Sequence, residues 1–164
     1  MQIRTTRKPL YAIGAVLAIG LLMAAALASP ARSTPPGTVT PELLARGTVA
    51  DGFSIHIDGI KMRVAGPVDV AVARLTFQPG KATGWHSHPG VTLVAVKSGT
   101  VTRYLADGCT RESFEHGQGF VEKPNVVHMV RNNGKVPAET IVTFIVPVGA
   151  PPLTPEPAPA HCNP

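Results

Sequence analysis

The sequence has little of several features that mark other classes of protein. Only two of its 164 residues are cysteine, no internal repeat is evident, and no apolar run after residue 28 is long enough to span a membrane. Helical periodicity is also missing, and only residues 41–46 are predicted to form a helical turn. These absences exclude a repeat protein and an α-helical domain.

The basic residues do not gather into a cluster. The formal net charge is +5, but Arg4, Arg7 and Lys8 supply three of these charges and the first 28 residues contain no acid, so the remaining chain carries +2. Because the other Lys and Arg residues are scattered singly, no nucleic-acid partner is predicted. We expect a small-molecule ligand, and a monomer or a homodimer.

Residues 1–28 have the features of a secretory signal peptide. A basic start is followed by an apolar run over 10–27, and Ala26-Leu27-Ala28 offers the small-x-small pattern of a cleavage site. The alternative is an uncleaved anchor, because a run of 18 residues reaches the lower limit for a membrane span. We expect a secreted, extracytoplasmic protein that contacts a membrane only if this segment is not cleaved.

Composition divides the remaining chain into a linker, one domain and a tail. Residues 29–41 are rich in Pro, Ser and Thr and predict an extended linker, residues 42–150 predict one domain, and residues 151–164 form a Pro-rich C-terminal tail. In an oxidising compartment an even pair of cysteines is expected to close, so we predict a disulfide between Cys109 and Cys162. The entropy of closing a loop of this length gives about 4 kcal/mol.

Short runs of β-branched residues predict an all-β domain. They are separated by turn pairs such as Asp58-Gly59 and Ser98-Gly99. The predicted strands are 46–50, 53–57, 61–64, 68–77, 91–96, 100–105, 120–122, 126–131 and 140–146. Many short strands at near-regular spacing indicate an antiparallel sandwich or barrel.

Three histidines in strand-like segments predict a metal site. His86 and His88 lie two residues apart, and because a strand has a period of two, both side chains should project from one face. His128 lies in a second such segment, V-V-H-M-V. Neutral imidazole binds transition metals, so we predict one divalent ion, Fe(II), Mn(II), Ni(II) or Zn(II), on these three residues. The other histidines are predicted to be solvated: His56, His116 and His161.

The two histidine-bearing segments resemble the two motifs of the cupin superfamily. In the first motif the chain has the expected Gly80, His86, His88 and Gly99, but Thr92 stands where the motif has a glutamate. In the second motif it has Gly117, Lys123-Pro124-Asn125, His128 and Asn132. Asn125 replaces a glycine, which is tolerable because Asn adopts positive φ more readily than other non-glycine residues.

The resemblance covers roughly residues 66–148 and implies a jelly-roll barrel, or double-stranded β-helix, with the metal in its mouth. The segments G-W-H-S-H-P-G and G-F-V-E-K-P-N-V-V-H and the cysteine pair further resemble small exported bacterial single-domain cupins. Without the glutamate, three neutral histidines leave a divalent ion its full +2 charge, which favours anionic or chelating ligands.

The resemblance leaves more than one function open. Histidine-only cupin sites resemble those of thiol dioxygenases and diketone-cleaving enzymes, which implies an Fe(II)-dependent dioxygenase or another oxidoreductase. A hydrolytic zinc site and a non-catalytic module that binds a metal or a small molecule are the alternatives.

Three further residues are assigned to the substrate pocket. Trp85 is predicted to form an apolar wall beside the metal. Thr92 either bonds a metal-bound water or is an ordinary strand residue. Glu122 is either an extra ligand or general base, or an exposed residue at the rim.

Overall fold

The computed structural model describes residues 39–162 and 164. The predicted signal segment, residues 1–28, and residues 29–38 of the predicted linker lie outside these described residues. The described chain is built from strands: β1 (Val39–Val49), β2 (Phe53–Ile57), β3 (Ile60–Val64), β4 (Val68–Phe77), β5 (His86–Ser87), β6 (Val91–Ser98), β7 (Thr100–Leu105), β8 (Arg111–Glu115), β9 (Gly119–Glu122), β10 (His128–Arg131), β11 (Ala138–Pro147) and β12 (Thr154–Pro155). No helix within residues 39–162 is long and apolar enough to cross a membrane.

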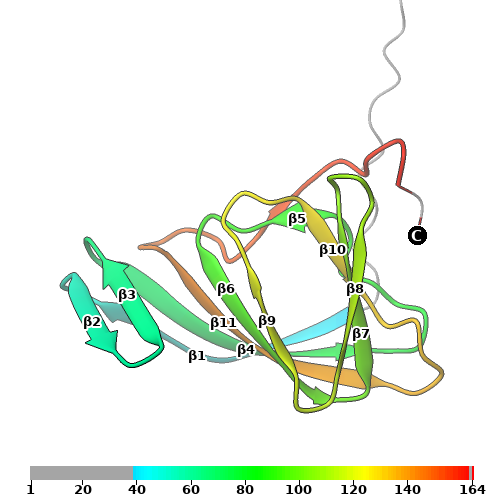
Figure 1. Ribbon diagram of the computed structural model, residues 1–164, viewed down its shortest axis with the longest axis horizontal. Helices are drawn as coiled ribbons and strands as arrows, with labels where there is room; N and C mark the ends of the chain where they lie inside the picture. Colours follow the sequence, from blue (N-terminus) through cyan, green and yellow to red (C-terminus); the bar gives the residue numbers. More distant parts are fainter. Residues whose placement is uncertain (1–38, 163) are drawn as a thin grey trace, which may run out of the picture. The chain divides into compact units, whose positions relative to one another are not determined.

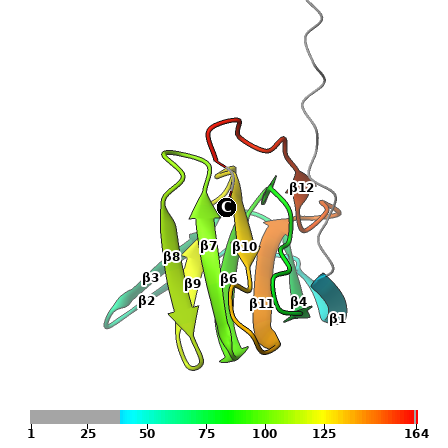
Figure 2. The same ribbon diagram turned by 90° about the vertical axis from the view of Figure 1, so that its right-hand side faces the viewer.

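Two five-stranded antiparallel sheets face each other (Figures 1 and 2). The strand orders are β1-β4-β11-β6-β9 and β12-β5-β10-β7-β8. From β4 onward, strands that follow one another in the chain mostly lie in different sheets, as in a jelly roll. The predicted all-β jelly-roll fold is therefore confirmed, and its topology places β5 beside β10.

The main core lies between the two sheets. β4, β6 and β11 alternate buried and more exposed residues along their length, so every second side chain points inward. The strands were predicted from β-branched runs between turn pairs, and the alternation is what such strands show when one face is buried. The buried cluster consists of Ala71, Ala73, Phe77, Val94, Val96, Val101, Phe120, Val130, Ala138, Val142, Phe144 and Val146.

The predicted helical turn at residues 41–46 is wrong, because these residues belong to the edge strand β1. Pairing with β4 runs from Val39 to Val49, with an irregularity between Leu43 and Ala45. Backbone pairing along this length outweighs the weak helical preference of six residues. The strand also begins three residues inside the segment that was expected to be linker.

A carboxylate in β4 holds the end of β1 in place. Asp69 accepts hydrogen bonds from Thr48 Oγ1 (2.6 Å), from the backbone N–H of Gly149 (2.9 Å) and from Arg46 Nη2 (2.6 Å). These donors, with Thr48 the strongest, lower the pKa of Asp69 to about 2. The carboxylate therefore ties β1, β4 and the segment after β11 together.

The β2–β3 hairpin extends from one end of the sheets (Figure 1). Its cross-strand pairs Phe53–Val64, Ile55–Met62 and Ile57–Ile60 are all apolar and share one face. The opposite face carries polar residues, including His56, which is exposed as predicted.

The C-terminal tail folds back onto the second sheet. β12 pairs with β5, and a second buried cluster beneath the tail contains Trp85, Tyr104, Met129 and Cys162. The predicted disulfide between Cys109 and Cys162 is confirmed, with Cα atoms 5.3 Å apart. The pairing of β12 with β5 near the start of the tail and the disulfide near its end therefore hold the tail on the sheet.

We predict that breaking this disulfide destabilises the domain. The bond closes a loop with a sequence separation of 53 residues, and the chain-entropy model assigns such a loop about 4 kcal/mol. Thermal unfolding with and without reductant, and of a Cys109→Ser/Cys162→Ser variant, measures the effect. An unfolding midpoint that is the same in all three samples would contradict the prediction.

Candidate metal site

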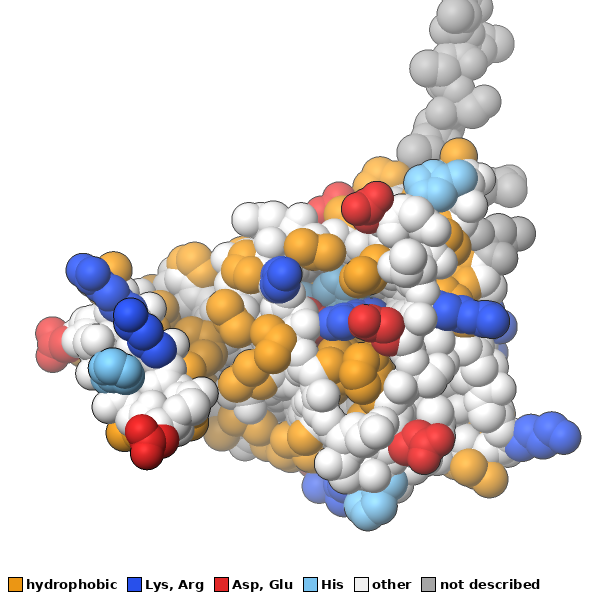
Figure 3. Space-filling model, viewed as in Figure 1, with side chains coloured by type: hydrophobic (Ala, Val, Ile, Leu, Met, Phe, Trp, Pro, Cys, Tyr) orange, Lys and Arg blue, Asp and Glu red, His pale blue; other side chains and the backbone are white. Residues whose placement is uncertain are grey.

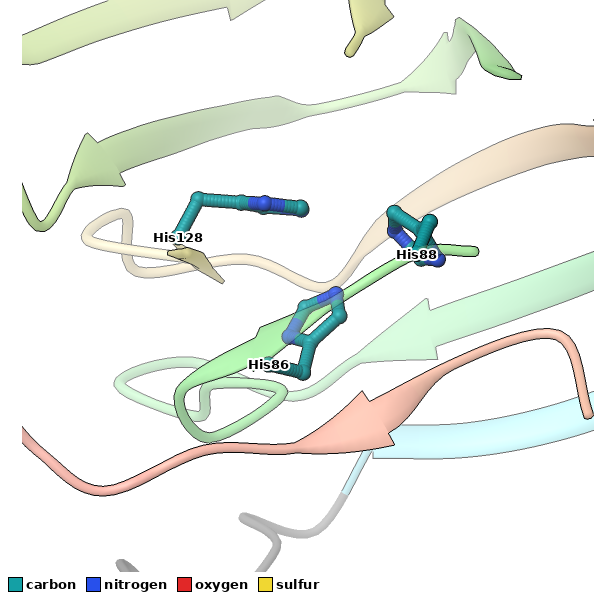
Figure 4. Close-up of side chains that lie close together, drawn as sticks. All are labelled: His86, His88 and His128. Atoms are coloured by element: carbon teal, nitrogen blue, oxygen red, sulfur yellow. The ribbon is translucent and has the colours of Figure 1, made fainter. Parts of the chain in front are cut away.

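Two neighbouring strands bring the three predicted histidines together. His86 is the first residue of β5 and His128 the first of β10, and the two are direct partners in the sheet. His88 follows β5 on the same face as His86, as its spacing predicts. All three are buried, and one ring nitrogen of each lies within 4.8 Å of those of the other two (Figure 4).

The backbone fixes how each ring is turned. Nδ1 of His86 donates to the carbonyl of Gly84 (2.9 Å), and Nδ1 of His128 donates to the carbonyl of Val126 (2.8 Å). In the same way Nδ1 of His88 donates to a carbonyl in the tail, described below. A carbonyl only accepts, so the proton of each neutral ring is on Nδ1 and the lone pair is on Nε2. Nε2 is thus the atom that each ring offers to a metal.

The ring contacts are consistent with a shared centre. The ring centroids of His86 and His128 are 4.4 Å apart, and that of His88 lies 4.9 Å and 5.1 Å from them. Burial, followed by the electrostatic interaction with the neighbouring His128 ring, lowers the pKa of His86 to about 4. His86 is therefore neutral near pH 7, which is the form that binds a metal.

Glu122 places a carboxylate beside these rings. Its Oε2 lies 3.0 Å from Nε2 of His88, and its Oε1 lies 3.0 Å from Nε2 of His128. Burial alone would raise the pKa of Glu122, but protons on the facing Nε2 atoms of His128 and His88 outweigh it in the metal-free site and lower this pKa to about 2. The site therefore contains a buried carboxylate in its charged form.

The surroundings of Nε2 in His128 and His88 favour a cation between these rings and Glu122. Nε2 of His128 is buried and, among the described residues, has no partner with hydrogen-bond geometry, although the Glu122 oxygen lies 3.0 Å away. At His88 a lone pair and a carboxylate oxygen at 3.0 Å repel each other unless a proton or another cation lies between them. Buried donors of this kind fit a divalent transition metal ion.

The expected absence of a carboxylate from the site is wrong. Glu122 is only 5% exposed. Of its two interpretations, the exposed residue at the rim is therefore wrong. Thr92, at the position of the motif glutamate, is the direct partner of Glu122 across β6 and β9. Because directly paired residues project from the same face, the carboxylate reaches the site from the neighbouring strand.

Thr92 faces the same side as Glu122 but, like Trp85, lines no cavity beside the histidines. Thr92 is fully buried, and within the described chain its Oγ1 has no hydrogen-bond partner. Trp85 directly precedes His86, so the alternation of the chain directs it to the opposite side, where it packs under the tail with Tyr104 and Met129. The expected apolar wall at Trp85 is therefore wrong, and Phe144, 5.5 Å from the His88 ring, lies there instead.

The tail contributes to the site, which the sequence reasoning missed. The carbonyl of Pro152 accepts the Nδ1 proton of His88 at 2.7 Å. Glu156 binds the outer side of β5 through two hydrogen bonds, from its N–H to the Trp85 carbonyl (2.9 Å) and from Ser87 Oγ to its carboxylate (2.7 Å). A strand of only two residues is thus supported on both edges.

Two backbone positions also shape the ligand segments. A side chain at Gly90 would overlap the carbonyl oxygen of Ile145, so only glycine lets the segment after His88 lie against β11. Asn125 has a φ of 59°, which confirms the expectation that Asn takes over the conformation of the motif glycine.

The site lies between two cavities of different character. One, the inner cavity of about 280 Å³, contains His86, His88 and Glu122 in an otherwise largely apolar wall. The other, the polar cavity of about 350 Å³, is lined by His128, Glu122 and charged residues of both signs: Asp107, Glu112, Arg103 and Lys123. Figure 3 views a face on which Lys and Arg side chains lie close to Asp and Glu side chains around a hollow. Of the three expected pocket residues, only Glu122 lines either cavity.

Comparison with known proteins shows a likeness to cupins over part of the chain. Residues 73–144 match the family model described as a cupin domain. It is 34% identical over 79 residues to germin-like protein subfamily 2 member 1 of Arabidopsis thaliana, a match that covers 46% of this chain. The chain spans about a third, 36%, of the length of that protein.

Solved structures with a similar chain path include cupins. A cupin-like protein from Thermotoga maritima is 25% identical, with a TM-score of 0.48, over 56% of this chain and 68% of that chain. Oxalate oxidase in complex with the substrate analogue glycolate is also 25% identical, with a TM-score of 0.44, over 52% of this chain and 45% of that chain.

We predict that replacing His86, His88 or His128 with Ala lowers metal affinity by more than the roughly 10–100-fold typical of a supporting residue, because each loses a ligand atom. His56→Ala, at an exposed histidine, is the matched control and should bind metal like the wild type. Metal content after equilibrium dialysis measures the effect. Equal metal content in all four variants would contradict the assignment.

The register of Thr92 and Glu122 gives a second prediction. Glu122→Thr should lower metal affinity, since it removes the only carboxylate within 3.0 Å of these rings in the described chain. Thr92→Glu/Glu122→Thr returns the carboxylate to the motif position and should recover most of that affinity. Calorimetric titration with Mn²⁺ tests both variants. If the exchanged pair binds Mn²⁺ no better than Glu122→Thr, the two positions are not equivalent.

Proposed function

We propose that the protein binds one divalent transition metal ion through Nε2 of His86, His88 and His128, with Glu122 as a fourth protein ligand. The observation that carries this proposal is the set of three Nδ1–carbonyl hydrogen bonds, which turn three buried lone pairs toward one another. Histidines that merely filled a core would need no common orientation of Nε2.

The donor set restricts the metal and its charge. Three imidazoles with one carboxylate suit Fe(II), Mn(II), Ni(II) or Zn(II), because the set combines nitrogen with a harder oxygen ligand. The Glu122 carboxylate reduces the net charge of the loaded site from +2 to +1. An anionic ligand is still attracted, but less strongly than at a histidine-only site.

We further propose that the site acts on a small anionic or chelating molecule as a metal-dependent oxidoreductase of the dioxygenase type. A bound divalent ion would supply Lewis-acid character and, if it is iron or manganese, redox chemistry with dioxygen. The residues of the chain would position the molecule. Lys123 in the polar cavity can pair with an acidic group, whereas Arg103 is already paired with Glu112. Phe144 limits water next to His88.

The second candidate is a non-catalytic module that binds a metal or a small molecule. The largely apolar wall of the inner cavity favours ligand binding and provides few groups for proton transfer beside Glu122. Under either function we propose an exported protein with a cleaved signal at residues 1–28, a location that the disulfide between Cys109 and Cys162 supports.

The proposal predicts that untagged protein contains about one equivalent of a transition metal and consumes O₂ only when a suitable acid is added. Elemental analysis gives the metal, and an oxygen electrode gives uptake with a panel of small 2-hydroxy and dicarboxylic acids. His128→Ala, which should lack metal, is the matched control.

Three outcomes separate the functions. Iron or manganese with acid-dependent O₂ uptake supports the oxidoreductase. One tightly held metal without turnover of any acid supports the binding module. Protein that takes up no transition metal from any of the four ions overturns both.

A further inference from the structure

Two small residues leave the space for the inner cavity. Ala71 and Ala73 occupy inward positions of β4, at which a larger side chain would fill the space between the sheets. Most of the other walls are large apolar side chains, and Arg46, Thr83 and Thr140 are further polar members of the lining, so the volume of about 280 Å³ lies within the core and reaches the histidines of the proposed metal site. The apolar lining is Ala71, Ala73, Leu75, Phe77, Val94, Phe120, Val130, Val142 and Phe144.

The cavity has a polar atom far from the histidines. Thr140 lines it, is only 1% exposed, and its Oγ1 has no hydrogen-bond partner among residues 39–162. Thr140 lies four positions before Phe144 on β11, a distance of roughly 13 Å along a strand. Phe144 is the neighbour of the His88 ring. An unpaired buried hydroxyl is costly, and a ligand atom that bonds to it would remove that cost.

Apolar side chains also line the exposed side of this cavity, together with Arg46, whose guanidinium is bonded to Asp69. Leu43 of β1 and Leu153 of the tail both line it, and they remain 64% and 39% exposed. Pro41 and Pro152 lie beside them in the lining. Exposed leucines at an opening favour entry of a molecule with apolar surface over entry of a small hydrophilic acid.

The polar cavity lies on the other side of the site. Glu122 lines both cavities, so the proposed metal position separates an apolar interior from a polar pocket that contains Arg103 and Lys123. A ligand whose acidic group stays at this boundary can place apolar atoms in the apolar interior, whereas the polar cavity suits polar atoms. Each half of such a ligand then meets a surface of matching polarity.

We propose that the ligand of this site is a slender amphiphilic acid. Its anionic or chelating head lies at His86, His88 and Glu122, and its apolar body lies along β4 and β11 toward Thr140. At about 30 Å³ for each water-sized group, the cavity volume of about 280 Å³ holds about nine non-hydrogen atoms in that body. This inference rests on the proposed metal site and names its ligand class.

The test is calorimetric titration of the Mn²⁺-saturated full chain with straight-chain carboxylates from acetate to dodecanoate. Each methylene buried in the cavity should raise affinity about fourfold up to decanoate, and dodecanoate should bind more weakly because it exceeds the volume. Affinity that does not change with chain length overturns the inference.

Variants locate the apolar body. Ala73→Leu fills the cavity and should abolish the gain with chain length while acetate affinity stays unchanged. Ala95→Leu makes the same change at an exposed position of β6 and should behave like the wild type. Ala71→Val serves if Ala73→Leu does not fold. Octanoate binding by the folded cavity variant at wild-type affinity overturns the inference.

Thr140 gives an independent readout. The wild type should bind 8-hydroxyoctanoate more tightly than octanoate, and Thr140→Val should remove that preference. An equal preference in both proteins contradicts the role of Thr140. Mn²⁺ stoichiometry is measured on each sample: about one equivalent without chain-length dependence overturns only the ligand class, whereas no bound Mn²⁺ in the wild type overturns the metal site on which it rests.

Discussion

Three hydrogen bonds from imidazole Nδ1 atoms to backbone carbonyls determine what this site can do. Two of the acceptors are local, because the carbonyls of Gly84 and Val126 lie two residues before His86 and His128. The third, at Pro152, is 64 residues from His88 and belongs to the tail. The geometry of one proposed ligand therefore depends on the docking of a segment that follows the barrel, and β12 and the disulfide hold that segment in place.

The carboxylate of the site comes from a different strand than the cupin motif leads one to expect. Thr92 and Glu122 are direct partners on β6 and β9, so exchanging the two residue types moves the carboxylate sideways without changing the sheet. The cost is a fully buried threonine whose Oγ1 has no hydrogen-bond partner within the described chain. The gain is a charged oxygen in contact with His88 and His128, which lowers the net charge of the site.

Local periodicity predicted much of this structure, and long-range contacts account for what it missed. The spacing of His86 and His88 is sufficient to place both on one face, and the turn glycines mark the strand ends. The inward position of Glu122 was also within reach, because it lies two residues from the apolar Phe120 on the same strand. The position of Trp85 follows equally from alternation, since it directly precedes His86. Neither the Pro152 contact nor the strand at residues 41–46 could be predicted, because partners distant in sequence decide both.

The central claim is that all three histidines offer Nε2 to one metal ion and keep the proton on Nδ1. Long-range ¹H–¹⁵N NMR correlation on the Zn²⁺-loaded protein measures the tautomer of each ring directly. The account predicts that His86, His88 and His128 all carry the proton on Nδ1, with the Nε2 resonances shifted by the metal. Protonated Nε2 in any of the three, or a metal-induced shift at Nδ1, would contradict it.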